Sequence, residues 1–181
     1  KAGNDYLDAG MTSGKTKIDG GDSDDILVGN GLSKMKGGEG DDIFVFYDNL
    51  TTTADAIKDF DVKHDVIALY PFVFDNTPVG YLDDAYFHVG KAAKTADHHV
   101  IYDKKTGALY WDEDGSGAMA QVKLASLDKH LKMHADNIFV ADFVQARRLE
   151  REPAVDPAAG SRRFHRRGDE LQRMGTVDRG G

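Results

Sequence analysis

The stretch Gly20-Gly-Asp-Ser-Asp-Asp-Ile-Leu-Val28 returns 17 residues later as Gly37-Gly-Glu-Gly-Asp-Asp-Ile-Phe-Val45. Both copies follow the pattern G-G-x-G-x-D-x-U-x, in which U is a large apolar residue, and Ser23 replaces the third glycine of the first copy. Residues 3–8, Gly-Asn-Asp-Tyr-Leu-Asp, form the back end of another copy. Recurrence at a fixed interval predicts a fold built from stacked repeats.

The residue types within each repeat indicate a turn that can hold a cation. Glycine adopts positive φ and lets backbones approach closely, so six residues can form a tight turn with several carbonyl oxygens in one small space. The Asp at the sixth place adds a carboxylate. Calcium takes about six to eight oxygen ligands in flexible geometry, which suits such a turn. The next three residues predict a short strand whose central apolar side chain points inward.

The spacing of the apolar places shows that intact repeats alternate with imperfect ones. These places are 11, 9, 8 and 9 residues apart: Leu7, Ile18, Leu27, Met35 and Phe44. Residues 9–19 are two residues too long and have no Asp at the sixth place. Residues 29–36 are one residue too short and carry lysines instead.

Two copies in register resemble the calcium-binding nonapeptide repeats of RTX (hemolysin-type) proteins. The resemblance implies a parallel β-roll in which each repeat makes half a coil, so that repeats n and n+2 stack. The turns at Asp5, Asp25 and Asp42 would then share one edge. We therefore expect a calcium ion between each neighbouring pair of these turns, two in all, and little or none along the opposite edge. The alternative is a flexible loop rich in glycine and aspartate that binds no ion.

The expected ligands follow from the pattern, and the outer acids Asp24 and Asp41 are expected to face water. Asp59 and Asp65 are candidates for a third site, against the alternative that they cap turns. The predicted side-chain ligands are Asp5, Asp25 and Asp42, and the predicted carbonyl ligands are Gly3, Gly20, Gly21, Asp22, Gly37, Gly38, Glu39 and Gly40.

The segment after the repeats also has a family resemblance. Residues 43–46, Ile-Phe-Val-Phe, are apolar at every position, which predicts a strand buried on both faces where the roll meets a cap. An Ile-x-Asp-Phe element ending at Phe60 follows, and then Asp65-Val-Ile-Ala-Leu69. This order resembles the C-terminal domain of serralysin-type proteases and of many other RTX exoproteins.

A β-hairpin is predicted at Val100–Trp111, because two apolar stretches flank Lys-Lys-Thr-Gly. The acidic loop Asp112-Glu-Asp-Gly-Ser-Gly117 is similar to the front of an EF-hand loop, but Lys123 occupies the twelfth place, so we favour a tight turn over an ion site. With a closing Asp136-Asn-Ile-Phe-Val140, these elements resemble the terminal segment of RTX proteins exported by type I secretion. That resemblance implies a native end near residues 141–144.

Composition excludes some classes of function and separates the tail from the rest of the chain. The formal net charge is -8, which argues against a nucleic-acid partner, and there is no cysteine. No apolar run is long enough to span a membrane. All lysines lie in residues 1–132 and all arginines in residues 147–179. We predict an all-β fold: a short parallel β-roll (1–46), a cap of antiparallel hairpin and sandwich-like strands (47–144), and a disordered, non-native-looking tail (145–181).

No pattern of catalytic residues is evident. His130 and His134 could share a helical face at zinc-ligand spacing, but no acid stands between them, and a solvated pair is favoured. We expect a non-catalytic module, internal to a longer protein, that binds calcium, folds outside the cell and uses type I export machinery. The alternative is the C-terminal part of a secreted metalloprotease, lipase or alginate epimerase whose catalytic domain lies upstream. A surface adhesin or S-layer-type protein is a third class.

Overall fold

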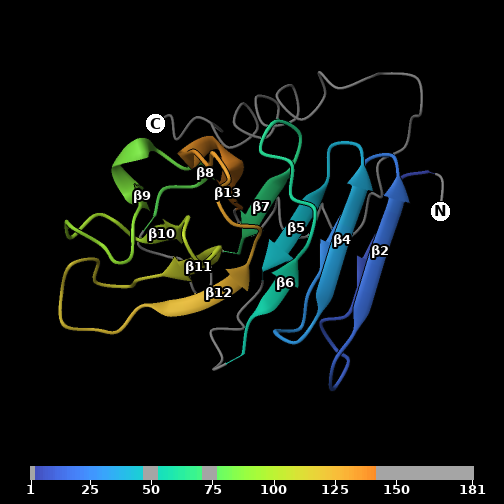
Figure 1. Ribbon diagram of the computed structural model, residues 1–181, viewed down its shortest axis with the longest axis horizontal. Helices are drawn as coiled ribbons and strands as arrows, with labels where there is room; N and C mark the ends of the chain where they lie inside the picture. Colours follow the sequence, from blue (N-terminus) through green and yellow to red (C-terminus); the bar gives the residue numbers. More distant parts are fainter. Residues whose placement is uncertain (1–2, 47–52, 71–76, 142–181) are drawn as a thin grey trace, which may run out of the picture.

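A computed structural model describes residues 3–46, 53–70 and 77–141 and confirms the predicted all-β fold (Figure 1). Short strands account for nearly all the regular structure, together with two single 3₁₀ turns, η1 (Asp84–Tyr86) and η2 (Ala135–Asn137). The strands are β1 (Tyr6–Asp8), β2 (Lys17–Asp22), β3 (Ile26–Val28), β4 (Lys34–Glu39), β5 (Ile43–Phe46), β6 (Asp55–Ile57), β7 (Val66–Leu69), β8 (Gly80–Tyr81), β9 (Phe87–Val89), β10 (Val100–Asp103), β11 (Ala108–Trp111), β12 (Val122–Ser126) and β13 (Ile138–Val140).

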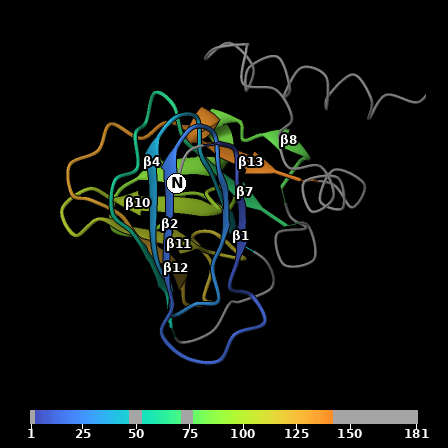
Figure 2. The same ribbon diagram turned by 90° about the vertical axis from the view of Figure 1, so that its right-hand side faces the viewer.

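Strands β1 to β7 alternate between two sheets, as a β-roll requires. One sheet has the order β1-β3-β5-β7-β13-β8 and the other the order β2-β4-β6-β12-β11-β10-β9. Strands β1, β3, β5 and β7 pair in parallel, as do β2, β4 and β6. Figure 2 shows the two sheets facing each other, with β2 and β4 on one side and β1 and β7 on the other. The predicted stacking of repeat n on repeat n+2 is therefore confirmed.

The apolar place of each repeat points into the space between the sheets. In one sheet Leu27 lies between Leu7 and Phe44 in the strand register, and in the other Met35 pairs with Ile18. Leu27, Met35 and Phe44 are completely buried. The spacings of 8 to 11 residues thus keep one large side chain per half coil in the core, whatever the length of the turn between them.

The two sheets differ on their outer faces. Outward positions of β2 and β4, such as Lys17 and Lys34, are exposed. Outward positions of β3 and β5 are apolar and buried, and they form a second cluster that includes Val28 and Val45. The prediction that residues 43–46 are buried on both faces is therefore confirmed.

The cap continues the sheets of the roll. Strand β12 pairs in parallel with β6, and β13 pairs in parallel with β7. The predicted hairpin is present as β10 and β11, with Val100 paired to Trp111. One core cluster runs from the roll into the cap and includes Phe44, Tyr102 and Trp111. The division at residues 46 and 47 remains a prediction, and the predicted tail of residues 145–181 lies outside the described residues.

The repeat turns bring two backbones close together at Gly38. Its φ is +111°, and a Cβ atom built there would collide with the carbonyl oxygen of Gly21 in the neighbouring turn. Gly14 has a similar φ of +97°, but a Cβ atom there would meet nothing within 4 Å. The two glycines therefore share the same backbone requirement and differ in the space around them.

We predict that Gly38→Ala destabilises the folded chain by about 1–3 kcal/mol more than Gly14→Ala. Both variants carry the cost of a side chain at positive φ, and only Gly38→Ala adds a collision that forces the stacked turns apart. Urea unfolding in saturating calcium measures the difference. Equal losses for the two variants would contradict the tight stacking of the turns.

Candidate metal-binding edge

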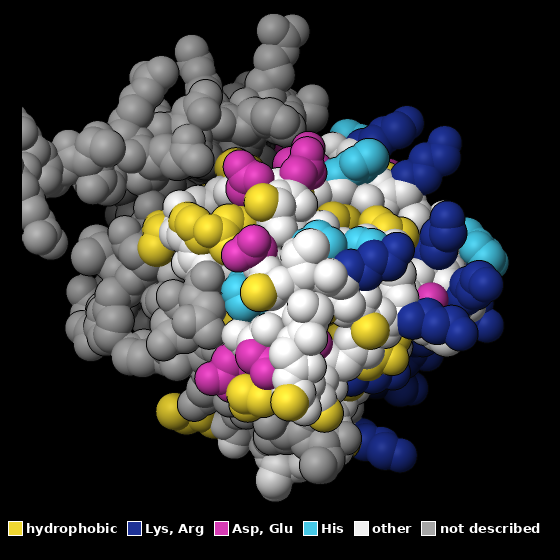
Figure 3. Space-filling view, turned by 90° about the vertical axis from the view of Figure 1, so that its left-hand side faces the viewer, with side chains coloured by type: hydrophobic (Ala, Val, Ile, Leu, Met, Phe, Trp, Pro, Cys, Tyr) yellow, Lys and Arg dark blue, Asp and Glu magenta, His cyan; other side chains and the backbone are white. Residues whose placement is uncertain are grey.

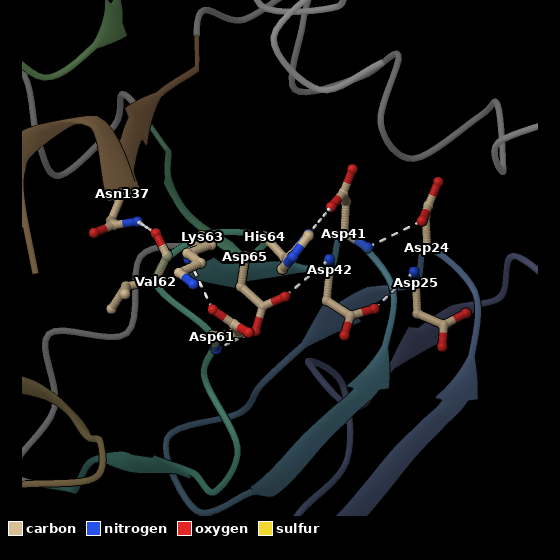
Figure 4. Close-up of polar contacts among 10 residues, drawn as sticks. All are labelled: Asp24, Asp25, Asp41, Asp42, Asp61, Val62, Lys63, His64, Asp65 and Asn137. Carbon is tan, nitrogen blue, oxygen red and sulfur yellow. Dashed lines mark hydrogen bonds and ion pairs between the residues drawn. The ribbon is translucent and has the colours of Figure 1, made fainter. Parts of the chain in front are cut away.

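A ladder of four aspartates runs along one edge of the roll. The backbone N–H of Asp5 donates to Asp25 Oδ1 at 2.7 Å, and that of Asp25 donates to Asp42 Oδ1 at 2.9 Å. The N–H of Asp42 donates in turn to Asp65 Oδ1 at 3.2 Å. Figure 4 shows the last three carboxylates in a row, each at the start of a strand of the same sheet. The structure thus brings the three predicted side-chain ligands together and adds Asp65.

The second carboxylate oxygen of the first three ladder residues has no hydrogen-bond partner among the described residues. Asp25 and Asp42 are fully buried, and Asp65 is 4% exposed. The Oδ2 atoms of Asp5, Asp25 and Asp42 are buried and have no hydrogen-bond partner within the described residues. Burying a carboxylate oxygen without a partner is costly, because water no longer solvates its charge. These oxygens therefore require a positive charge or a proton.

The pKa values of the ladder carboxylates also indicate that a positive charge is missing beside them. Burial raises the pKa of Asp42 and that of Asp65 to about 7 each, and neighbouring carboxylates add to both shifts. Burial also raises the pKa of Asp25. Within the described part of the chain, no lysine or arginine pairs with a ladder carboxylate. A bound cation would supply the missing charge.

The glycine turns lie between neighbouring rungs of the ladder. Gly20 lies against the Asp25 carboxylate and Gly37 against that of Asp42, so closely that neither position has room for a Cβ atom. The carbonyl oxygens predicted as ligands belong to these two turns, at residues 20–22 and 37–40, and to the turn before Asp5, at Gly3. Among the described residues no three His, Cys, Asp or Glu side chains gather as a metal cluster. Any cation here therefore depends on backbone carbonyls as well as on aspartates, and the ligand set remains a prediction.

The two candidates for a third site have different surroundings. Asp59 accepts the backbone N–H groups of Gly37 and Gly38, each at 3.0 Å, so it caps the last glycine turn. Asp65 continues the ladder and also accepts the N–H of Asp61 at 2.8 Å. The sequence Asp65-Val-Ile repeats the Asp-x-apolar ending of the intact copies. This shared pattern is the sequence feature that relates Asp65 to the aspartates of the repeats.

The expectation that Asp41 faces water is wrong. Asp41 is 5% exposed, its N–H donates to Asp24 Oδ1 at 3.0 Å, and its own Oδ1 lies 2.8 Å from His64 Nδ1. Stacking brings these outer acids into register just as it does the inner ones, and a histidine from the next turn covers the last one (Figure 4). The hydrogen bond to Asp41 raises the pKa of His64. Asp24 is half-buried.

The opposite edge of the roll is chemically different. There Asn30 donates from Nδ2 to the carbonyl oxygens of Thr12 and Gly14, both at 3.0 Å. Asp55 is buried, and its Oδ1 accepts the N–H of Ser33 at 2.7 Å. This edge thus holds a side-chain amide, hydroxyl groups and one buried carboxylate, Asp55, instead of a ladder of aspartates. Asp55 was not among the predicted residues, although Asp55-Ala-Ile57 also has the Asp-x-apolar form.

The histidine pair singled out in the sequence has no helical geometry. His130 has a φ of +65° and is exposed, and His134 precedes the short turn η2. The alternative that both lie on one helical face is therefore wrong, because the segment before η2 contains no helix, and both side chains are exposed, as expected for a solvated pair. No helix in the described residues is long and apolar enough to cross a membrane.

Comparison with known proteins places most of the chain in one family. The profile described as Peptidase M10 serralysin C terminal matches residues 9–143. One similar solved structure is that of the AlgE6R3 subunit from the Azotobacter vinelandii mannuronan C5-epimerase, with 26% sequence identity. The match covers 87% of this chain and 88% of that chain, with a TM-score of 0.40. No curated protein sequence matches.

The raised pKa values predict how the calcium-free chain responds to pH. A folded-state pKa near 7 for Asp42 and Asp65, against an ordinary value of 3.8, means that the folded chain binds protons that the unfolded chain has released. The stability that these extra protons give the folded chain is fully present below the ordinary pKa of the carboxyl groups and is lost as pH rises through about 7. The raised pKa of His64 acts in the same direction.

We therefore expect protons to keep part of the calcium-free chain folded at about pH 5, and its urea midpoint to decrease as pH rises to about 8. Saturating calcium should remove most of this dependence, because the cation replaces the protons. A calcium-free midpoint that rises over the same interval would show that the ladder carboxylates are already neutralised by other groups.

Proposed function

Because the chain belongs to the peptidase M10 serralysin C-terminal family of RTX-type domains, we propose that it is a calcium-binding module that folds after secretion. The observation that carries this proposal is the row of buried Oδ2 atoms of Asp5, Asp25 and Asp42, which have no hydrogen-bond partner among the described residues. Oxygen-rich turns on both sides of these atoms suit a hard cation that takes many oxygen ligands.

The proposed sites lie between the turns that carry neighbouring rungs. One calcium ion would bind between the turns at Asp5 and Asp25, and another between those at Asp25 and Asp42. The carbonyl ligands would come from residues 3, 20–22 and 37–40. Asp65 continues the ladder and has a raised pKa, which supports a third site between the Asp42 turn and residues 59–65. We further propose the division into a roll (1–46) and a cap (47–144).

The mechanism couples binding to folding. Without calcium, the stacked carboxylates repel one another, burial opposes their charge, and ordering glycine-rich turns costs conformational entropy. The unfolded chain then suits passage through a narrow type I exporter. Outside the cell, the free energy of calcium binding becomes free energy of folding. Extracellular modules bind calcium with dissociation constants on the order of 10⁻⁴ to 10⁻³ M, which matches a switch that acts only outside.

The module itself is proposed to be non-catalytic. The matching family is a C-terminal domain family named after a peptidase, and this favours attachment to a larger secreted enzyme. A His-Glu-x-x-His motif upstream of Lys1 would identify a metalloprotease, and a Gly-x-Ser-x-Gly motif would identify a lipase.

A calcium titration followed by far-UV circular dichroism tests the proposal with two matched variants. Asp42→Asn keeps the shape of a ladder residue and the acceptor for the Asp25 N–H but removes the charge. Asp19→Asn removes the same charge from an exposed position on β2, where Asp19 lies 4.0 Å from Lys36. We expect the wild type and Asp19→Asn to gain β-structure at the same calcium concentration. Asp42→Asn should need at least about tenfold more calcium, because charged ligands set the affinity of such sites.

Two results would overturn the proposal. One is a fully folded β spectrum in excess chelator that calcium does not change. The other is a calcium midpoint for Asp42→Asn equal to that of Asp19→Asn.

A further inference from the structure

The loop between β11 and β12 is a second place where buried carboxylate oxygens lack partners, far from the roll. It follows Trp111 and packs against the loop of residues 90–98, and both loops project from the cap at the left of Figure 1. The N–H of Asp112 donates to His99 O at 2.8 Å, and that of Ser116 donates to Thr95 O at 2.9 Å. Gln121 Nε2 donates to Lys91 O at 2.9 Å. These contacts fix the loop at both ends.

The tight turn predicted for this loop is present. Asp114 Oδ2 accepts the backbone N–H groups of Ala118 and Met119 at 2.8 and 3.0 Å, and the N–H of Gly117 donates to Asp114 O at 3.1 Å. The turn therefore accounts for one carboxylate oxygen of Asp114. It leaves the other oxygen of Asp114 without a partner, and Asp112, whose carboxylate accepts the backbone N–H of Asp114, also keeps one oxygen without a partner in the described part of the chain.

Asp112 and Asp114 each have one buried carboxylate oxygen of this kind. Asp112 is 5% exposed, and its side chain lies within hydrogen-bond distance of the Asp114 side chain. Asp112 Oδ1 and Asp114 Oδ1 are both buried and have no hydrogen-bond partner in the described part of the chain. Gln121 Oε1, in the same segment, is also buried without a partner. Two carboxylates this close require a shared proton or a cation, because their charges repel.

The neighbouring histidine and lysine side chains do not pair with the carboxylates of Asp112 and Asp114 in the described part of the chain. His99 is buried, and its Nδ1 lies 2.7 Å from the backbone oxygen of Asp112 rather than from its carboxylate. Lys91 and Lys94 of the facing loop are exposed, and neither forms an ion pair with Asp112 or Asp114 among the contacts of the described residues. Figure 3 shows this end of the molecule, where lysine, histidine and acidic side chains share one face.

We propose that the loop of residues 112–121 binds a divalent cation, calcium in an extracellular setting, through Asp112 Oδ1 and Asp114 Oδ1. The order Asp112-Glu-Asp-Gly-Ser-Gly117 places oxygen-bearing side chains at alternate positions, as in the first half of an EF-hand loop. Lys123 replaces the bidentate glutamate of such a loop, so neutral oxygens complete the coordination, with Gln121 Oε1 as the nearest candidate in sequence. Two charged ligands place the affinity at the weak end, on the order of 10⁻³ M.

Trp111 makes this site separable from the roll in an experiment. It is the only tryptophan of the chain, is 1% exposed and directly precedes Asp112. In their common sheet β11 stands three strands from β4, which is roughly 14 Å at the usual strand spacing. Terbium, a lanthanide that occupies calcium sites, emits strongly when a nearby excited tryptophan transfers energy to it. Loss of this emission in Asp112→Asn therefore assigns the emission to the loop rather than to the ladder.

The test titrates terbium into calcium-folded wild type, Asp112→Asn and Asp97→Asn. Asp97 is an exposed acid in the facing loop, so its variant controls for a general loss of negative charge. We expect saturable emission that excess calcium displaces in the wild type and in Asp97→Asn, and a loss of at least about tenfold in Asp112→Asn. If Asp112→Asn fails to fold, Asp114→Asn replaces it, because its amide oxygen can still accept the two backbone N–H groups of the turn.

The proposal is overturned if wild-type emission through Trp111 is absent, or if Asp112→Asn emits as strongly as Asp97→Asn. Absent emission would mean that the two carboxylates share a proton. This outcome is distinct from failure of the roll proposal, since the calcium response of the far-UV spectrum depends on the ladder. A chain that folds with calcium but gives no tryptophan-excited emission would refute the loop site alone.

Discussion

The fold depends on a hydrogen bond that repeats from turn to turn: a backbone N–H of one coil donates to the aspartate of the next. This bond fixes the register between Asp5, Asp25, Asp42 and Asp65. It satisfies one carboxylate oxygen of Asp25 and of Asp42, and the other oxygen of each is buried without a hydrogen-bond partner among the described residues. The same contact that orders the stack therefore creates an unbalanced negative charge inside it. Stability and cation binding are consequently two aspects of one arrangement.

The glycines and the apolar residues make this arrangement compatible with a packed core. Gly38 lets its turn approach the Gly21 carbonyl, at a distance that excludes a Cβ atom. Leu27 and Phe44 follow two residues after their aspartates, so a carboxylate at the edge and an apolar side chain in the core are always adjacent along the chain. The cap then extends both sheets and closes the open end of the roll through β12 and β13.

Most of the roll could be predicted, because its repeat places identical residue types at identical points of the coil. The alternation of sheets and the shared edge of Asp5, Asp25 and Asp42 follow from the repeat spacing together with the resemblance to RTX repeats, and the buried strand of residues 43–46 follows from its apolar composition. The burial of Asp41 could not be predicted in this way, because His64 comes from a segment outside the repeats. The capping role of Asp59 likewise depends on contacts made across 22 residues.

The cap was less predictable for the same reason. The hairpin of β10 and β11 is local in sequence, and the pattern found it. The pairing of β12 with β6 and of β13 with β7 joins segments about 70 residues apart, and no local pattern encodes such contacts. The loop after Trp111 shows the limit most clearly. Its turn could be predicted from the sequence. Its buried oxygens without partners could not, because their burial depends on the packing of residues 90–98 against the loop.

We expect cations to bind along the aspartate ladder and not along the edge that carries Asn30 and Asp55. The most direct test is a crystal structure of the chain grown in calcium, with anomalous scattering used to locate the ions. We expect ions between the turns at Asp5 and Asp25 and between those at Asp25 and Asp42, with none stacked along the opposite edge. Ions along both edges, or an empty ladder in saturating calcium, would contradict it.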